Sequence, residues 1–557
     1  MTDQPPTVPD APVETELKFE FEPAQLRSLA RHPAFAGKPV VKKLTSTYFD
    51  TPSFALRQAG FTLRVRRVGT RFIQTVKRDR GSMFERDEWE TPVPTRNVDM
   101  VALEATPAGK AAAKTGEPLV PVAVIRANRA IRLWADGDAA IEIVVDRCEI
   151  EAGAAKHSFM ELELELKAGQ AKAVHALAGA LFDITPLRLG LTSKGERGYR
   201  LAGAKEAAFD PELTAEMPVA AAFAAIARAC LAQVIEQAAA FRAKAHPEGI
   251  HQTRVGLRRL RTALRLFETV VRDHDRDRLN AEVEWLANEL GPARNLDVFL
   301  EDVFDPTALT DPGVAKRYEA WLQRARKAAY QQASAALESP RFARLTLDLA
   351  LWIEDGDWLR PIGDATRAIQ LGQPAAAFAA VVLEDLRRTV KKRGKDLVTL
   401  DVERRHSLRI RCKRLRYASE FFAHAFDSRR KKHAAFVGAL KEMQNALGLL
   451  NDMAQAHESA AETLGKGAPQ QLVFAAGELV GRLRAKKGKN LEKSVAGYDA
   501  LMKAERFWGE PASDKPAKEK PAKEKAGKGK KKGKGKKAKA AKAAKSKPPE
   551  DGGGAPA

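Results

Sequence analysis

The sequence is short of cysteine and lacks a glycine-rich loop followed by lysine. Its 557 residues hold three cysteines, Cys148, Cys230 and Cys412, which lie far apart and show no metal-ligand spacing. Three widely spaced cysteines cannot all pair, so this usage favours a reducing compartment and argues against a zinc ribbon. The missing glycine-rich loop argues against a P-loop mechanism of phosphate binding.

Long uncharged apolar runs are also missing. No stretch reaches 18 apolar residues without a charge, and the first residues have neither a basic region nor the apolar region of a secretory signal. We therefore expect a soluble cytoplasmic protein that makes no use of a membrane.

Charge of one sign dominates only locally. The formal net charge is +22, from 94 Lys and Arg against 72 Asp and Glu. About half of this excess lies beyond Pro511, where 16 Lys face five acidic residues in a segment of Lys, Ala, Gly and Pro. Such a segment is expected to be disordered and to attract polyanions in a salt-sensitive way. A polyanionic partner follows from this balance.

Two kinds of hydrophobic periodicity divide the chain. Short segments with period-2 alternation occupy the first part, and long runs with helical spacing occupy the second. The fold class is therefore an N-terminal α+β domain of antiparallel strands followed by an all-α domain. The expected boundaries are 1–12 disordered, 13–202 strand-rich, 203–217 linker, 218–508 helical and 509–557 a disordered basic tail.

The strands of the first domain carry charge on one face. In ETELKFEF, Glu14, Glu16 and Lys18 project to one side while apolar residues project to the other. Half-exposed antiparallel strands would explain any single case. However, carboxylates gather at both ends of the domain and cations in its middle. A closed barrel with these faces inward would hold an anion together with a metal ion.

The ordered motifs of this domain resemble the CYTH family, the triphosphate tunnel metalloenzymes, over residues 12 to 201. The resemblance implies an eight-stranded antiparallel β-tunnel. One departure is Cys148, where the family usually has Gly. The matching motifs are E-x-E-x-K at 14–18, YFDT at 48–51, LRVRR at 63–67, TVK at 75–77, R-x-E-x-E at 86–90, Arg129 thirteen residues before Glu142, Asp146, E-x-E-x-E at 161–165 and SKGERGY at 193–199.

The resemblance implies cleavage of a phosphoanhydride bond by positioning and charge neutralisation. The residues it would use for Mg²⁺ or Mn²⁺ are Glu14, Glu16, Asp146, Glu161 and Glu163. The residues that would clamp phosphate oxygens are Lys18, Arg64, Arg66, Lys77, Arg86, Arg129 and Lys194. Spacing alone leaves open which of Arg126, Arg129 and Arg132 faces inward.

The attacking water needs activation. The metal could supply it, or a carboxylate such as Glu88, Glu90 or Glu142 could act as a base, with Lys18 also part of the catalytic set. The plainer alternative is that these three glutamates only pair with neighbouring arginines.

The helical domain repeats a basic stripe. Each stripe begins at a histidine, and the second begins 155 residues after the first, so a duplicated helical unit is expected. Neither stripe offers the helical spacing of a zinc site, and we expect the histidines to contact phosphate or to be structural. The stripe residues are His251, Arg254, Arg258, Arg261 and Arg265, then His406, Arg409, Lys413 and Arg416.

A basic helix face is ordinarily a solvated surface. Here we expect no acidic residue four positions away to neutralise the stripes, and the stacked like charges favour an anionic ligand. Tyr417 is the one aromatic residue beside a stripe, and it is expected to pack. A single-stranded nucleic-acid site would add more stacking platforms.

Residues 218 to 505 resemble the CHAD family, the conserved histidine α-helical domain, whose ligand is inorganic polyphosphate. Both halves of the duplication match, including Asn451 and Asp452, and Asp297 occupies the place of Asp452 in the first half. The first half departs at Asn295, in an expected loop where the family more often has Asp. The resemblance implies two basic helices facing each other across a pore or groove.

Three function classes remain. The first is a metal-dependent inorganic triphosphatase that hydrolyses tripolyphosphate, with the CHAD domain binding polyphosphate. Within enzymes, hydrolysis or cyclisation of an organic triphosphate such as ATP or thiamine triphosphate is the alternative. A non-catalytic polyphosphate-binding protein associated with granules is the second class. A nucleic-acid-binding protein driven non-specifically by the tail is the third.

Overall fold

The computed structural model describes residues 13–206, 208–464, 468–485 and 487–509. The predicted disordered segments at 1–12 and 510–557 lie outside the described residues, and so does the side chain of Asp452.

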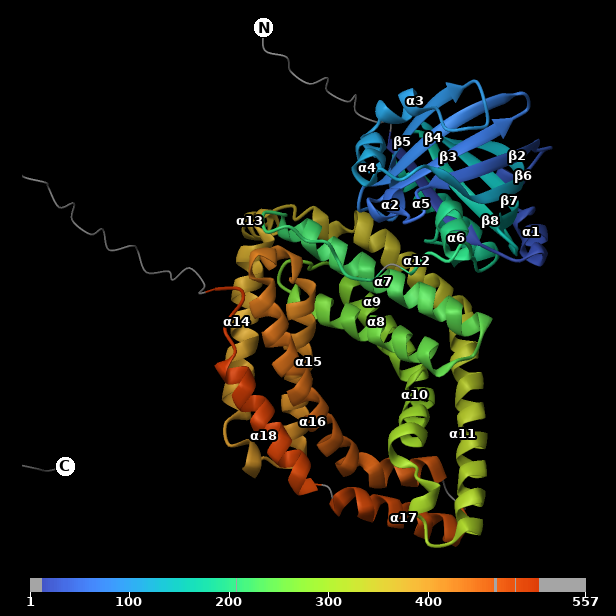
Figure 1. Cartoon of the computed structure of the whole chain (residues 1–557). Helices are drawn as coiled ribbons and strands as arrows, with labels where there is room; N and C mark the ends of the chain where they lie inside the picture. Colours follow the sequence, from blue (N-terminus) through green and yellow to red (C-terminus); the bar gives the residue numbers. More distant parts are fainter. Residues whose placement is uncertain (1–12, 207, 465–467, 486, 510–557) are drawn as a thin grey trace, which may run out of the picture. The chain divides into compact units, whose positions relative to one another are not determined.

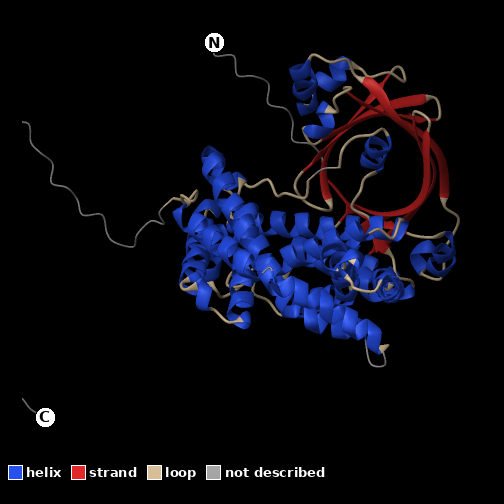
Figure 2. Ribbon diagram, turned by 60° about the horizontal axis from the view of Figure 1, so that its bottom comes forward, coloured by secondary structure: helices blue, strands red, loops and turns tan. Residues whose placement is uncertain are grey.

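Eight antiparallel strands form a closed barrel. Their order around it is β5-β4-β3-β2-β6-β7-β8-β1, and pairing of β1 with β5 closes the ring, which Figure 2 shows from one end. A two-residue strand, β9 (Arg188–Leu189), adds to β1. The predicted eight-stranded antiparallel tunnel is confirmed. The barrel strands are β1 (Val13–Glu20), β2 (Val40–Asp50), β3 (Phe61–Val68), β4 (Arg71–Asp79), β5 (Glu85–Val93), β6 (Val120–Asp136), β7 (Ala139–Ala152) and β8 (Ala155–Ala168).

Short helices cover the outside of the barrel. On one side, α2 (Ala55–Gln58), α3 (Met100–Glu104) and α4 (Pro107–Thr115) pack on the apolar outer faces of β3 and β4. On the other side, α1 (Pro23–Leu29) and α5 (Ala171–Ile184) pack on β1, β7 and β8. Because side chains alternate along a strand, burying the apolar face outward turns the charged face into the lumen.

A further helix, α6 (Lys194–Leu201), closes one end of the barrel. A Cβ added at Gly195 would lie 2.8 Å from the Tyr48 ring, and one at Gly198 would lie 2.9 Å from Ala123. Both glycines therefore allow the helix to press against interior residues of β2 and β6. Arg57 of α2 fixes the helix by two hydrogen bonds of 2.7 Å to Glu196. The remaining lumen is polar.

The second domain is entirely helical, as predicted (Figure 1). Its helices are α7 (Val219–Ala243), α8 (Pro247–Leu266), α9 (Asp275–Glu289), α10 (Gly291–Val298), α11 (Pro312–Glu338), α12 (Pro340–Asp355), α13 (Ala365–Gly372), α14 (Ala375–Gly394), α15 (Val402–Phe421), α16 (Arg430–Leu464), α17 (Gln470–Ala485) and α18 (Lys487–Lys503).

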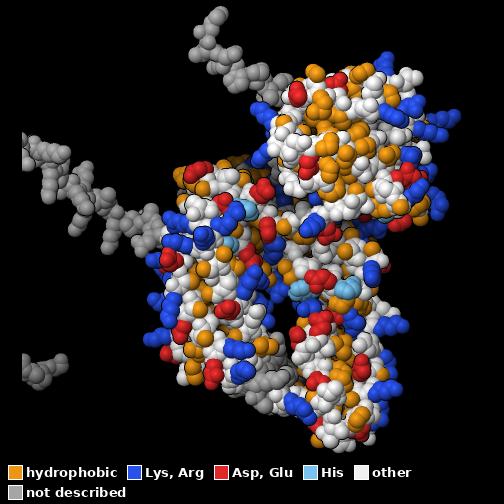
Figure 3. Space-filling view, viewed as in Figure 1, with side chains coloured by type: hydrophobic (Ala, Val, Ile, Leu, Met, Phe, Trp, Pro, Cys, Tyr) orange, Lys and Arg blue, Asp and Glu red, His pale blue; other side chains and the backbone are white. Residues whose placement is uncertain are grey.

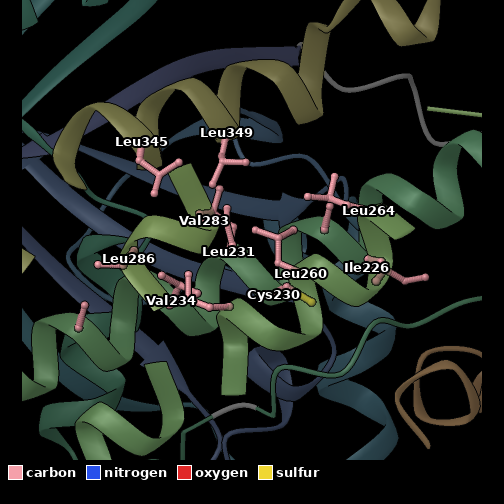
Figure 4. Close-up of a cluster of buried hydrophobic side chains, with 14 of the residues drawn as sticks. Ile226, Cys230, Leu231, Val234, Leu260, Leu264, Val283, Leu286, Leu345 and Leu349 are labelled. Carbon is pink, nitrogen blue, oxygen red and sulfur yellow. The ribbon is translucent and has the colours of Figure 1, made fainter. Parts of the chain in front are cut away.

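The duplication is visible in the aromatic core. Phe267 ends α8 and Phe422 ends α15, and their ring centroids lie 6.0 Å apart. Phe223 of α7 and Phe378 of α14, also 155 residues apart, pack on them at 5.3 and 6.4 Å respectively. Equivalent residues of the two halves thus meet, and α8 and α15 run against each other. Figure 4 shows the core of the first half, where α7, α8, α9 and α12 interdigitate.

Among the described residues, one helix is long and apolar enough to cross a membrane. In α7 the most apolar window of 18 residues has a mean hydropathy of 1.6, and 61% of it is buried inside the protein. Its buried face packs on α8 and α12, so much of this helix belongs to the core of the helical domain.

Candidate functional site

The barrel encloses a charged tunnel of about 1170 Å³. Acid-bearing strands β1, β8 and β7 are neighbours, and cation-bearing β3 and β4 lie across the lumen from them. Asp146 and Glu161 are fully buried and do not themselves line the tunnel. Both contact Lys194, which does line it. The predicted site residues that line the tunnel are Glu14, Glu16, Lys18, Arg64, Arg66, Lys77, Arg86, Glu88, Glu90, Arg129, Glu142, Glu163 and Lys194.

Cations cross-link the carboxylate wall. Lys194, at the first turn of α6, contacts Glu161, lies 2.6 Å from Glu163 and 3.1 Å from Asp146. Arg129 of β6 binds Asp146 at 2.9 and 2.6 Å and also donates to Glu163 at 2.8 Å. Helix α6 therefore delivers one lysine into a site otherwise built from strands.

The β1 glutamates are paired in the same way. Glu14 contacts Lys77, while Glu16 contacts Lys18 and accepts a hydrogen bond of 2.7 Å from Arg86. Burial favours the protonated form of Glu16, but the charges of Lys18 and Lys77 lower its pKa to about 2. The carboxylate thus remains ionised over the physiological range.

Glu161 and Glu163 titrate differently although both contact Lys194. Burial raises the pKa of Glu161 to about 7, against the opposing charge of Lys194. Burial acts in the same direction on Glu163, but Lys194 and Arg129 together hold its pKa well below 4.5. The Oε2 atom of Glu161 is buried and has no hydrogen-bond partner among the described residues.

Among the arginines and lysines predicted to clamp phosphate, Arg66 has the weakest protein partner within the described residues. Its Nε donates to Ser46 Oγ at 3.3 Å, and the described residues provide it with no ion pair. Burial, and then the charges of Arg64 and Arg129, lower its pKa to about 10. Three guanidinium groups therefore converge where an anion would be stabilised.

The three glutamates weighed as bases have different surroundings. Glu88 lies 3.3 Å from Lys77 and 3.5 Å from Arg64, and Glu90 accepts a hydrogen bond of 3.1 Å from Thr75. Glu142 also lines the tunnel, and within the described part of the chain its carboxylate has no recorded ion pair or hydrogen bond. The alternative to a role as base, in which the glutamate only pairs with neighbouring cations, thus describes Glu88 best and Glu142 least.

The fit of a divalent metal can be judged from the donors. Among the described residues, no three His, Cys, Asp or Glu side chains stand together as a ready metal cluster, since Lys or Arg separates the carboxylates. Nevertheless, the available donors are all carboxylate oxygens, which suit hard ions such as Mg²⁺ or Mn²⁺. The partnerless oxygen of Glu161 is one open ligand position. The chemical type of these donors therefore fits Mg²⁺ or Mn²⁺.

The structure also distinguishes the arginines of β6. Arg126 is exposed and paired with Glu151 at 2.5 Å, and Arg132 lies over the Phe35 ring outside the barrel. Arg129 alone of the three faces the tunnel, because it shares the inner face with Ala127 and Ile131. Cys148 takes the next inward place on β7 after Asp146 and is buried against α6.

Several tunnel residues were not predicted as site residues, namely Lys42, Tyr48, Thr75, Glu165 and Lys167. Period-2 alternation carried further would have found them, because Lys42 and Tyr48 share the inner face of β2, and Glu165 and Lys167 continue that of β8.

The helical domain holds a second cavity of about 1170 Å³. Seven stripe residues line it, four from α15 and three from α8, and Figure 3 shows a hollow with Lys and Arg side chains along its α15 side. These residues are His251, Arg254, Arg258, His406, Arg409, Lys413 and Arg416. Sequence reasoning missed Arg294 and Asn295 of α10 and His433, Lys441 and Gln444 of α16, although the α16 residues recur at helical spacing.

Two predicted cavity residues lie elsewhere. Arg261 pairs with Glu284 of α9 at 3.0 Å, and Arg265 pairs with Glu268 at 3.4 Å, so neither lines the cavity. We expected the α8 stripe to form one continuous face toward its ligand. However, α8 packs against α15, and the end of the stripe with Arg261 and Arg265 lies outside the cavity. The assumption that the stripes lack nearby acids was also wrong, since Arg416 pairs with Glu420 four residues later at 3.2 Å.

The segment containing Asn295 and Asp297 is helical, in α10, rather than the expected loop. Asp297 is 2% exposed and accepts hydrogen bonds of 2.7 Å from Arg326 and 3.0 Å from Tyr330. It anchors α10 to α11, whereas Asn295 faces the cavity. Tyr417 is buried beneath Arg416, whose guanidinium lies 4.8 Å from the ring centroid, as packing would require.

Comparison with known proteins identifies both domains. The family model for the CYTH domain matches residues 13–199, and that for the CHAD domain matches residues 225–461. The CHAD domain of Ricinus communis is 32% identical, and the match covers 54% of this chain and 98% of that one, with a TM-score of 0.46. The chain thus contains a CYTH domain followed by a CHAD domain, and it belongs to the CHAD family.

Two further solved structures match at lower sequence identity. PptA from Streptomyces chartreusis is 17% identical, with 51% of this chain and 100% of that one covered and a TM-score of 0.39. HpAC1 from Hippeastrum, named for adenylyl cyclase and reported with a dominant triphosphatase activity, is 17% identical, with 34% and 94% covered and a TM-score of 0.26. The CYTH domain places the barrel among triphosphate tunnel enzymes, a family of triphosphatases and cyclases that is generally metal-dependent.

Proposed function

We propose that the CYTH domain is a metal-dependent inorganic triphosphatase that hydrolyses tripolyphosphate, and that the CHAD domain binds inorganic polyphosphate. The proposal of a triphosphatase rests mainly on Arg66. It sits in the tunnel beside Arg64 and Arg129 with a serine hydroxyl as its recorded partner, so its charge calls for an anion from outside the chain.

The two walls of the tunnel would divide the work. Arg64, Arg66 and Lys77 would hold the phosphate oxygens from the cationic wall, with the arginines able to bind two oxygens each. Lys18, Arg86 and Lys194 pair with carboxylates, as Lys77 does with Glu14, and these pairs would keep the tunnel ordered until a substrate exchanges the partners.

Glu14, Glu16, Asp146, Glu161 and Glu163 would hold Mg²⁺ or Mn²⁺. When bound, the ion supplies neutralisation of phosphate charge and lowers the pKa of water. Among the chain's own groups, Glu142 is best suited to take the proton of the attacking water, because it lines the tunnel and its carboxylate has no ion pair or hydrogen bond within the described residues.

The cavity of the CHAD domain suits a repeating anion. It gathers cations and histidines from α8 and α15, while Tyr417, the aromatic ring next to the α15 stripe, is covered by Arg416. Repeated phosphates need charge and hydrogen bonds but no base stacking, whereas single-stranded nucleic acid gains much of its affinity from stacking. Binding to polyphosphate would also place the protein on cytoplasmic polyphosphate granules.

The test of the enzyme is phosphate release from tripolyphosphate, ATP, thiamine triphosphate and long-chain polyphosphate, with Mg²⁺, Mn²⁺ or a chelator. We expect tripolyphosphate to be cleaved fastest and the chelator to abolish cleavage. Faster cleavage or cyclisation of ATP would assign the tunnel to organic triphosphates. No turnover of any substrate, with polyphosphate binding retained, would leave a binding protein.

A further inference from the structure

Helices α8 and α15 cross each other. Residues at equivalent positions of the two repeats lie on opposite sides of this crossing. At the cavity side, Arg259 of α8 lies over the Phe421 ring of α15 at 5.6 Å, and Arg416 and Glu420 stand beside it. On the other side the stripe arginines displaced from the cavity, Arg261 and Arg265, approach α15. The duplication thus offers each charged group a counterpart 155 residues away.

The two sides differ sharply in charge. Arg259 is held by Gln233 at 3.0 Å, by the carbonyl of Phe209 at 2.9 Å and by Asp210 at 3.3 Å. Its counterpart is Arg414, and the position equivalent to Gln233 is Arg388, which itself pairs with Glu384 at 3.2 Å. Arg414 therefore lacks the acceptor that satisfies Arg259.

Two more replacements act in the same direction. Gly256 of α8 corresponds to Arg411 of α15, and Glu420 of α15 corresponds to Arg265 of α8. The cavity side of the crossing thus has Gly256 and Glu420, and the other side has Arg411 and Arg265 at the equivalent positions. With Arg261 and Arg414 this makes a group of four arginines.

These four side chains are close and incompletely paired. Burial, and then the charges of Arg265, Arg411 and Arg261, lower the pKa of Arg414. In the described part of the chain neither Arg411 nor Arg414 has a recorded ion pair, and the Nε of Arg411 is buried without a partner. The pairs of Arg261 and Arg265 with glutamates are largely exposed, which makes them weak and replaceable.

We propose that Arg261, Arg265, Arg411 and Arg414 form a second phosphate-binding site, outside the cavity, that a long polyphosphate chain occupies together with it. The inference rests on the proposed polyphosphate binding and deepens it. Lys413 and Arg414 are consecutive, one in the cavity and one in the cluster, and Arg265 lies two turns beyond Arg258, about 10 Å along α8. A chain leaving the cavity along these helices meets the cluster directly, and a short chain does not reach both.

The experiment measures binding of long-chain inorganic polyphosphate to the full chain over a range of salt concentrations. The variants are Arg411→Gln/Arg414→Gln for the cluster and Arg409→Gln/Lys413→Gln for the cavity. Arg404→Gln/Arg430→Gln is the control, since it removes the same charge from two exposed arginines paired with Asp401 and Asp427. All variants share the basic tail, so its contribution cancels.

We expect the cluster variant to bind roughly tenfold more weakly than the control, with a salt slope smaller by about two. Its thermal unfolding, followed by helical circular dichroism, should match that of the control, which shows that the helical domain folds. Equal binding by the cluster variant and the control, with binding lost in the cavity variant, would overturn the second site alone. No loss in the cavity variant would instead overturn polyphosphate binding by the cavity itself.

Discussion

At the scale of residues, two inward-facing glutamates on one strand differ in how readily they take up a proton. Glu161 and Glu163 both project inward from β8 and share Lys194, but Glu163 also receives Arg129. This second cation keeps Glu163 ionised, while burial leaves Glu161 with a pKa of about 7. A tunnel of mixed charge can in this way hold both an anionic substrate and a carboxylate that still exchanges a proton.

Replacing Glu142 with Gln should lower kcat for tripolyphosphate by about 10²- to 10⁴-fold, with little change in stability, because the substitution removes a proton acceptor without emptying an ion pair. The measurement is steady-state phosphate release. Glu88→Gln is the comparison, since Glu88 is engaged by Lys77 and Arg64, and its loss should act mainly on KM. A larger loss of kcat in Glu88→Gln would transfer the role of base to that residue.

His251 predicts how polyphosphate binding varies with pH. Burial, and then the charge of Arg294, lower its pKa in the free protein, with Arg258 adding to the effect and Glu248 opposing it. A bound polyanion favours the protonated ring, so binding takes up a proton and affinity rises as pH falls from about 8 to 6. Titration by calorimetry in two buffers would show the proton uptake. His251→Gln should flatten the pH profile, and an unchanged profile would exclude this histidine.

At the scale of elements, α6 determines the shape of the tunnel. Its position depends on close approach at Gly195 and on the pair between Arg57 and Glu196, and it places Lys194 among three carboxylates. The helix is thus both the closure of the barrel and part of its site.

Gly195→Ala should destabilise the protein by about 1–3 kcal/mol, because the new Cβ would lie 2.8 Å from Tyr48 and 2.9 Å from Thr62. Activity should fall as well, since Lys194 moves with the helix. Gly179→Ala is the matched control, because nothing lies within 4 Å of a Cβ there, and Ala in the middle of α5 should be neutral or stabilising. Thermal unfolding of both variants decides, and equal melting temperatures would contradict this role of α6.

Strand alternation predicted the barrel and most of the tunnel lining because the charged and apolar faces are separated by period 2, as in Glu14, Glu16 and Lys18. Whether Arg126, Arg129 or Arg132 faces inward depends on the register of β6, which spacing alone does not determine. For the helical domain, the stripes were visible, but the fate of Arg261 and Arg265 depends on how α8 meets α15. Contacts between different helices, such as that of Arg261 with Glu284, leave no signal in the pattern of a single helix.

At the scale of the whole molecule, basic charge gathers in the tunnel, in the cavity, in the arginine cluster between α8 and α15, and in the 16 lysines beyond Pro511. The first two are built sites, where cations face enclosed space. The tail offers only charge, which salt screens efficiently.

Deleting residues 510–557 should weaken polyphosphate binding at low salt and have little effect near 0.3 M salt, where a Debye length of about 6 Å suppresses non-specific attraction. Hydrolysis of tripolyphosphate should be unchanged. Loss of nearly all polyanion binding at every salt concentration would instead favour the reading in which the tail drives binding to nucleic acid or other polyanions.

The central claim is that the tunnel carboxylates support metal-dependent cleavage of tripolyphosphate. Phosphate release with Mg²⁺ or Mn²⁺ should be compared between the unchanged protein and Glu14→Gln/Glu16→Gln. Thermal unfolding is the control for folding of the barrel, and long-chain polyphosphate binding is the control for the helical domain. The account predicts rapid cleavage that the double substitution abolishes while binding persists. Equal cleavage by the two proteins would contradict it.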